Sequence, residues 1–343
     1  MIELKRDRLH FSFPEVHKQA KLTVELQRTL RIPDDDRTYP LPPGLGNFPL
    51  CHVDDHASNV PQGWRRRGGV MMPMYQSEAL WINFKANFVS ARGHGYPFAI
   101  KIATGKVCAV TGEGWQNELS LHQQDYVVAP TQPWLDGYCV EKNLIRQFVA
   151  MPLGAGYSAE EQITGEAEHG GIQIIAYPML GEEFEKRFPF SKTKSRMQHD
   201  VGLNKLCLAD VADMEMGLAP GGKMRQEIAE DKFGFGAWDH NHSSRCFIHM
   251  TNSLVWQSVT GKRPPQPSPT AKTYSQHGLP WFDYYSESPA LNGSKKLSQL
   301  KTVHQVGIEM GQKPLPENET AVPINVNVIA PQASKYQVRE GEY

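Results

Sequence analysis

The sequence predicts an α+β protein in which antiparallel β-structure dominates. Residues 98–103 and 106–110 form two apolar runs joined by Thr104-Gly105, which favours a tight hairpin because glycine accepts a positive φ without steric cost. The chain also lacks the regular alternation of strands and helices that builds a parallel sheet. These two observations favour hairpins and antiparallel pairing over a doubly wound fold.

The β-rich part extends over residues 1–185. Residues 21–31 alternate apolar and polar side chains with one break at Arg28, as in a half-buried strand. Residues 33–49 are rich in proline and glycine and predict a loop. Ser158 and Glu161 have the spacing of a capping box and predict a short helix. Further strands are predicted at 69–75, 79–84, 124–129, 145–152 and 171–178.

A mixed part extends over residues 199–343 and carries most of the predicted helix. The boundary lies at the basic segment 186–198, and because this connection is short, the two parts can share one core. The apolar positions at steps of three and four in 294–312 predict an amphipathic helix. The remaining predictions are helices at 249–259 and 269–276, a strand at 322–329 and a polar tail from 332 onward.

Composition limits the classes of partner. The chain has 343 residues, of which 36 are Lys or Arg and 37 are Asp or Glu, so its balanced charge gives no general attraction to nucleic acid or an anionic membrane. The five cysteines stand singly, which argues against a disulfide framework or a zinc ribbon. No apolar run approaches the roughly 18 residues of a membrane helix, and no secretory signal is evident. We therefore expect a soluble, cytoplasmic protein without a membrane partner.

The densest group of reactive side chains holds Asp239, His240, His242 and His249. In a strand, His240 and His242 would lie on the same side, and Asp239 would support them as an outer partner. Neutral imidazole binds divalent transition metals such as zinc. These four residues are therefore the candidate metal ligands. Beside the pair of His240 and His242, the third ligand would come from His249, His199, Asp200 or His169.

This group also has an interpretation without metal. Asp and Asn are common turn residues, and Gly234 and Gly236 stand just upstream of Asp239. A polar loop is therefore the alternative structure.

Residues 64–69 combine a tryptophan, three arginines and two glycines. Guanidinium groups can hold phosphate or carboxylate through paired hydrogen bonds, and the indole ring offers a stacking surface. This segment is a candidate anion-binding patch, with a solvated turn as the alternative. One short patch on a protein of balanced charge is thin support for nucleic-acid binding.

Three weaker motifs leave other chemistry open. Residues 217–224 have the glycine and lysine spacing of a phosphate-binding loop, but Met224 stands where that motif needs a hydroxyl for Mg²⁺, so a glycine-rich hairpin or loop is expected instead. His52 and His56 would share a face only on a helix, which the nearby prolines disfavour. Glu160 and neighbouring glutamates lie close to His169 and could include an acid–base pair or form a solvated helix face.

Two functions remain open from the sequence. The leading expectation is a non-catalytic structural or interaction protein that self-assembles, because no complete catalytic signature occurs and the many aromatic and methionine residues suit interfaces. The alternative is a metal-dependent hydrolase with its site around residues 239–249, since a catalytic zinc takes three protein ligands and one open position. The sequence does not decide whether the protein is an enzyme.

Overall fold

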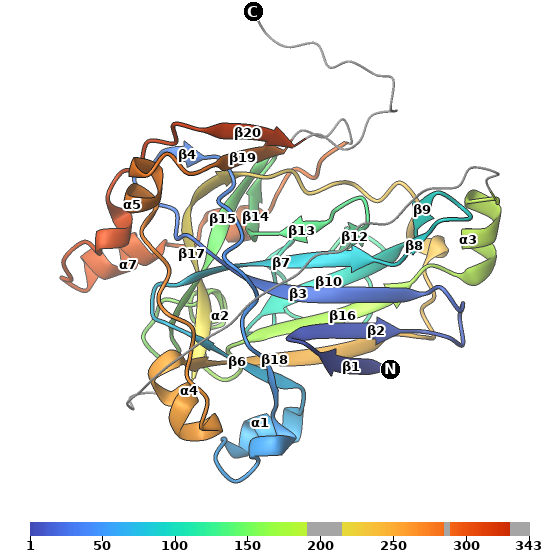
Figure 1. Cartoon of the computed structure of the whole chain (residues 1–343), viewed down its shortest axis with the longest axis horizontal. Coiled ribbons are helices and arrows are strands. Elements are labelled where there is room, and N and C mark those ends of the chain that lie inside the picture. The colour runs from blue at the N-terminus through green and yellow to red at the C-terminus, as the bar shows by residue number, and fades with distance from the viewer. Residues whose placement is uncertain (191–214, 285–288, 330–343) are drawn as a thin grey trace, which may run out of the picture.

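Two β-sheets form the body of the protein (Figure 1). The computed structural model describes residues 1–190, 215–284 and 289–329. Along its main path the first sheet contains β1 (Ile2–Lys5), β2 (Arg8–Ser12), β3 (Lys21–Thr29), β7 (Ala79–Ala86), β15 (Leu144–Pro152), β17 (Met216–Arg225) and β4 (Thr38–Tyr39). Beside this path, β13 (Trp134–Leu135) pairs with β7, and β14 (Gly137–Glu141) pairs with β15.

The second sheet carries the candidate site. Its path contains β11 (Val107–Cys108), β10 (Phe98–Thr104), β16 (Ile172–Pro178), β18 (Ser244–Asn252), β6 (Val70–Met74) and β5 (Cys51–His52), and β12 (Val127–Ala129) pairs with β10. Two small sheets pair β8 (Phe88–Val89) with β9 (His94–Gly95), and β19 (Trp281–Tyr284) with β20 (Val326–Ile329). Most strand pairs are antiparallel; those of β17 with β4, β18 with β6 and β19 with β20 are parallel. The predicted α+β class with mainly antiparallel strands is therefore confirmed.

One apolar core fills the space between the two sheets. Leu22 and Val24 of β3 belong to the same buried cluster as Ile100 of β10 and Ile174 of β16. Phe13, which precedes β3, brings its ring to 5.9 Å from that of Phe98 on β10. Strands from beyond residue 198 lie inside both sheets, since β17 pairs with β15 and β18 pairs with β16. Residues before and after the predicted boundary thus contribute to one core.

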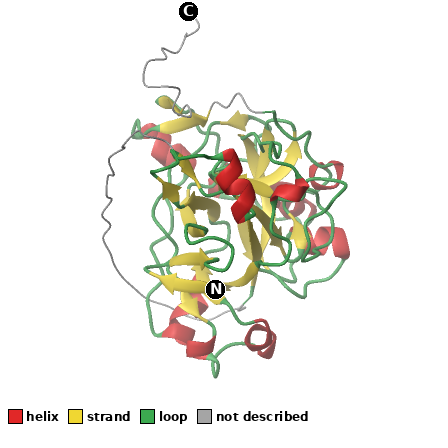
Figure 2. Ribbon diagram, turned by 90° about the vertical axis from the view of Figure 1, so that its right-hand side faces the viewer, coloured by secondary structure: helices red, strands yellow, loops and turns green. Residues whose placement is uncertain are grey.

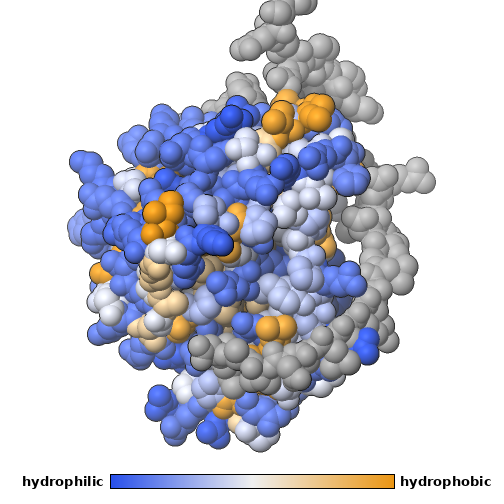
Figure 3. Space-filling model, turned by 90° about the vertical axis from the view of Figure 1, so that its left-hand side faces the viewer, coloured by the Kyte–Doolittle hydropathy of each residue, from blue (hydrophilic) through white to orange (hydrophobic). Residues whose placement is uncertain are grey.

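The helices are short and lie on the outside of the strands (Figure 2). They are α1 (Gln62–Arg67), α2 (Ala159–Thr164), α3 (Gly181–Arg187), α4 (Ser253–Thr260), α5 (Ala271–Gln276), α6 (Lys295–Ser298) and α7 (Val303–Glu309). Among the described residues, every helix is too short or too polar to cross a membrane. The face that carries α5 and α7 is mainly hydrophilic with separate apolar spots (Figure 3), and Ile308 and Met310 are exposed.

Several elements follow the sequence prediction closely. β3, β7, β15 and β16 occupy the predicted strand segments. The capping box forms at the start of α2, where the backbone N–H of Glu161 donates to the Ser158 hydroxyl. The hairpin of β10 and β11 also forms, but its turn lies at Gly105-Lys106, one residue later than predicted. Both turn residues have positive φ, 53° and 61°, which is the geometry of a type I′ hairpin turn.

Three local predictions are wrong. Residues 244–252 form strand β18, and the helix predicted from 249 begins only at Ser253, because Asn252 caps α4 and the preceding residues pair with β16 and β6. The helix predicted over 294–312 is divided into α6 and α7, since Thr302 starts a new capping box. The glycine-rich segment 217–224 is part of strand β17 rather than a hairpin or loop. The basic boundary segment lies partly, and the polar tail entirely, outside the described residues.

Candidate functional site

The outer face of the second sheet places polar and aromatic side chains together. Cys246 and Ile248 of β18 point into the core. Successive strand residues point to opposite faces, so Arg245 and Phe247 lie on the outside. Phe247 is the direct partner of Gln173 on β16, which brings that amide to the same face. These alternating positions form the floor of a groove.

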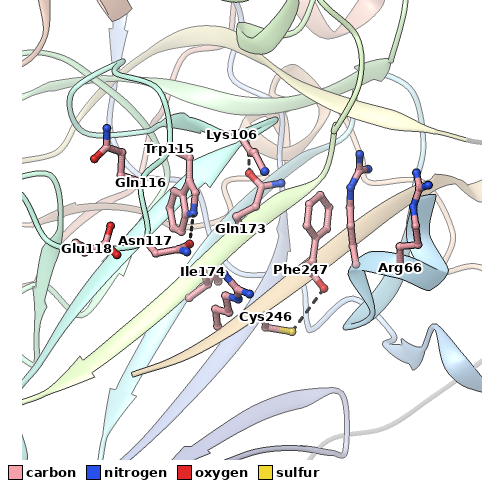
Figure 4. A pocket seen from close by; sticks show the side chains of 12 residues that line it. Arg66, Lys106, Trp115, Gln116, Asn117, Glu118, Gln173, Ile174, Cys246 and Phe247 are labelled. Carbon is pink, nitrogen blue, oxygen red and sulfur yellow. Dashed lines mark hydrogen bonds between the residues drawn. The ribbon is translucent and has the colours of Figure 1, made fainter. Parts of the chain in front are cut away.

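The groove has a volume of about 620 Å³ and two walls. Figure 4 shows Trp115, Gln116 and Asn117 on one side and Arg66 on the other, with Gln173 and Phe247 between them. The first wall is the loop that follows β11, and the second is helix α1. The residues that line it are Arg66, Arg67, Lys106, Trp115, Gln116, Asn117, Glu118, Gln173, Ile174, Arg245, Cys246 and Phe247.

Positive charge dominates this lining. It contains four cationic side chains and the single carboxylate of Glu118, an excess of three positive charges. Within the described part of the chain, no carboxylate lies within ion-pair distance of Arg66, Lys106 or Arg245. Unpaired cations in a concave surface concentrate anions.

Arg67 is held in place from two sides. Its Nη2 lies 3.4 Å from the Glu168 carboxylate and donates to the Glu168 carbonyl oxygen at 3.2 Å. Its guanidinium carbon lies 5.5 Å from the centre of the Phe247 ring. The Glu168 side chain is largely exposed, so this ion pair is weak. Arg67 therefore keeps most of its capacity to bind an anion.

Buried Lys101 anchors the loop that bears Trp115. Its ammonium group pairs with Asp125 at 2.7 Å and donates to the backbone carbonyls of Gln116 and Glu118. It also lies 5.4 Å from the centre of the Trp115 ring. The indole Nε1 donates to Asn117 at 3.2 Å. Trp115 is thus fixed by its own loop while it remains partly exposed along the groove.

A stack of three rings supports the opposite wall. His249 lies 4.5 Å from Trp64 of α1 and 4.3 Å from Phe247, measured between ring centres. Its Nε2 donates to the carbonyl oxygen of Gly68 at 3.0 Å, and burial lowers its pKa to about 3. A neutral imidazole can stack closely between two apolar rings because it carries no charge to desolvate. The stack fixes α1 to β18 and thereby positions Arg66 and Arg67.

The described residues that line the groove include no activated thiol. Cys246 is the one cysteine in its lining, and burial raises its pKa to about 12. The thiolate is the nucleophilic form of cysteine, and this form is absent at neutral pH when the pKa is so high. The lining therefore offers cations, amides and aromatic surface, which are groups that bind a ligand.

The four predicted metal ligands lie in two places: Asp239, His240 and His242 belong to a turn, whereas His249 belongs to strand β18. The carboxylate of Asp239 accepts from the backbone N–H groups of Asn241 and His242, and its second oxygen lies 2.9 Å from His242 Nδ1. The ring of His240 stacks on Phe235, with centres 4.3 Å apart. Residues 239–243 lie outside the strands, so the same-side arrangement expected for His240 and His242 in a strand does not arise.

His249 lies far along β18 from this turn. His249 lies five residue steps along the strand from Ser244, a distance of roughly 16 Å. Over the described ranges of the chain, no group of three or more His, Cys, Asp or Glu side chains could hold a metal ion. His199 and Asp200 lie outside the described residues. The metal site at Asp239, His240, His242 and His249 stays a prediction.

Glu160 and His169 are brought together just before the first residue of β16. Glu160 is buried and accepts from the backbone N–H groups of Glu168, His169 and Gly170, and its Oε1 lies 3.1 Å from His169 Nδ1. A carboxylate with several backbone donors stabilises a loop. This pair holds the loop before β16, which also carries the Glu168 partner of Arg67.

His52 and His56 do not share a helix. His52 belongs to β5, while His56 ends the single 3-10 turn Asp54–His56. The arrangement with both imidazoles on one helical face is therefore not formed.

Comparisons with known proteins give no relative: no family model, no curated protein and no solved structure matches this chain. The site must therefore be interpreted from its own geometry.

The sequence pointed to only one wall of the groove. The arginine patch at 64–69 supplies Arg66 and Arg67, whereas its tryptophan is buried in the ring stack and offers no free stacking surface. Trp115, Gln173 and Arg245 were missed because each stands alone in the sequence. The alternation of apolar and polar residues along β18 was the one signal that could have placed Arg245 on an outer face.

Proposed function

We propose that this protein is a non-catalytic binding protein whose groove takes a small anionic ligand. The observation that carries this proposal is the excess of three positive charges in a groove of about 620 Å³. That volume is typical of small-molecule sites. Guanidinium groups bind phosphate with paired, directional hydrogen bonds, and arginines come from both α1 and β18.

Titration calorimetry with inorganic pyrophosphate at low ionic strength tests the proposal. We expect one binding site whose affinity falls as salt is added. Arg66→Ala and Arg245→Ala should each weaken binding about tenfold, because each removes charged hydrogen bonds. Arg65→Ala is the matched control, since Arg65 is exposed on the same helix and does not line the groove. Absence of binding, or equal loss in Arg65→Ala and Arg66→Ala, contradicts the proposal.

Self-assembly and metal-dependent hydrolysis stay predictions of the sequence. Light scattering over a hundredfold range of protein concentration tests the first. The second is tested by the metal content of the purified protein, as argued in the Discussion.

A further inference from the structure

We propose that the anionic ligand is a free nucleotide, with its base on Trp115 and its phosphates at the arginines of α1 and β18. This inference rests on the proposed function and adds the class of ligand. Its basis is the separation of two kinds of surface on opposite sides of one groove (Figure 4).

The phosphate side is defined by charge. Arg66 and Arg67 come from α1, and Arg245 comes from the floor strand. Lys106 lies on the Trp115 side of the groove, because its carbonyl oxygen accepts from the Trp115 N–H at 2.8 Å. A ligand with only one carboxylate group would need a single guanidinium group to bind it. Three guanidinium groups match a ligand with several negative charges, such as a di- or triphosphate.

The base side is defined by Trp115 and its neighbours. One side of the indole meets the buried ammonium of Lys101, while the side chain lines the groove. Aromatic side chains stack on nucleobases of any sequence. Gln116 and Asn117 are exposed beside it, and the Asn117 Oδ1 already accepts from the indole, which leaves its amide N–H₂ group for a ligand. A planar group with hydrogen-bonding edges fits this wall better than an aliphatic one.

The choice of a free nucleotide over a nucleic-acid strand follows from size and charge. A groove of about 620 Å³ suits a small molecule. The whole chain has a net charge of −1, so it exerts no general attraction on a long nucleic-acid backbone.

Binding of nucleoside triphosphates and of inorganic tripolyphosphate is measured side by side on the full chain. We expect the nucleotide to bind at least tenfold more tightly, because stacking adds to the phosphate contacts. Trp115→Leu should remove this difference and leave tripolyphosphate binding unchanged, which also shows that the groove still folds. Trp115→Phe should restore part of it. Trp134→Leu is the control, since Trp134 is a partly buried tryptophan of the first sheet.

The outcomes separate the two proposals. Tripolyphosphate binding without any preference for nucleotides overturns the nucleotide and leaves the proposed function standing. If the wild-type protein binds neither tripolyphosphate nor nucleotides, the proposed function is overturned as well. A single-stranded oligonucleotide that binds more than tenfold tighter than the triphosphate overturns the free nucleotide in favour of a strand.

Discussion

The rings of Trp64 and His249 stack with their centres 4.5 Å apart and their planes at 24°. Through this contact a buried imidazole in β18 fixes the helix that carries Arg66 and Arg67. Burial lowers the pKa of His249 to about 3, so the stack depends on a neutral ring. His249 is also one of the four predicted metal ligands, and that role stays a prediction beside the observed ring stack.

The neutral state of His249 predicts a loss of stability in acid. The unfolded chain binds a proton near pH 6.5, whereas the folded chain binds it only near pH 3. Between these values the unfolded state holds more protons, so the free energy of unfolding falls as the pH decreases. The free energy of unfolding, measured with denaturant, should fall between pH 7.5 and pH 4.5. This fall should be about 2 kcal/mol smaller in His249→Phe than in the wild type. The exposed His122→Phe is the control, and an unchanged pH dependence in His249→Phe would assign the acid loss to other groups.

We predict that replacing Lys101 lowers both the stability of the protein and its affinity for nucleotides. Lys101→Met leaves Asp125 without its partner and removes two hydrogen bonds to the loop that bears Trp115. Breaking a buried pair in this way costs about 3–5 kcal/mol. We expect lower stability in urea and weaker nucleotide binding. The double variant Lys101→Met/Asp125→Asn should recover part of the stability, and equal stability of the single and double variants would argue against an uncompensated charge.

We predict that strand β17 tolerates no side chain at Gly222. A Cβ atom at this position would lie 2.3 Å from the carbonyl oxygen of Pro33. Gly222→Ala should therefore destabilise the protein by about 1–3 kcal/mol, measured by chemical denaturation. Gly236→Ala is the control because nothing lies within 4 Å of its Cβ position. A neutral Gly222→Ala would mean that the two backbones are further apart in solution.

Metal content separates the proposed function from the hydrolase. A hydrolase at residues 239–249 requires stoichiometric metal in the purified protein and its loss in His240→Ala/His242→Ala. The non-catalytic proposal expects the same metal content in both proteins. Elemental analysis of both gives the answer, and unfolding of the variant is measured alongside, because His242 interacts with the turn carboxylate of Asp239. Loss of the metal in a variant that stays folded would favour the hydrolase.

Much of the first half of the fold was predictable because its signals are local. The alternation at residues 21–31 produced β3, and the Ser158–Glu161 spacing produced the cap of α2. Residues 249–252 were assigned to a helix because their sequence also suits one. Pairing of β18 with β16 and β6 decides between the two structures, and no local pattern reports that pairing.

The amino-acid sequence alone determined the class of fold, the longer strands of the first half, and the run of arginines at 64–69, since each depends on neighbouring residues. Only the tertiary structure decided that Trp115, Gln173 and Arg245 face one groove and that Asp239 and His249 lie apart. The physical reason is that strand pairing joins residues distant along the chain. The ligand site is made by that convergence, whereas hydrophobic periodicity records only which side of a strand is buried.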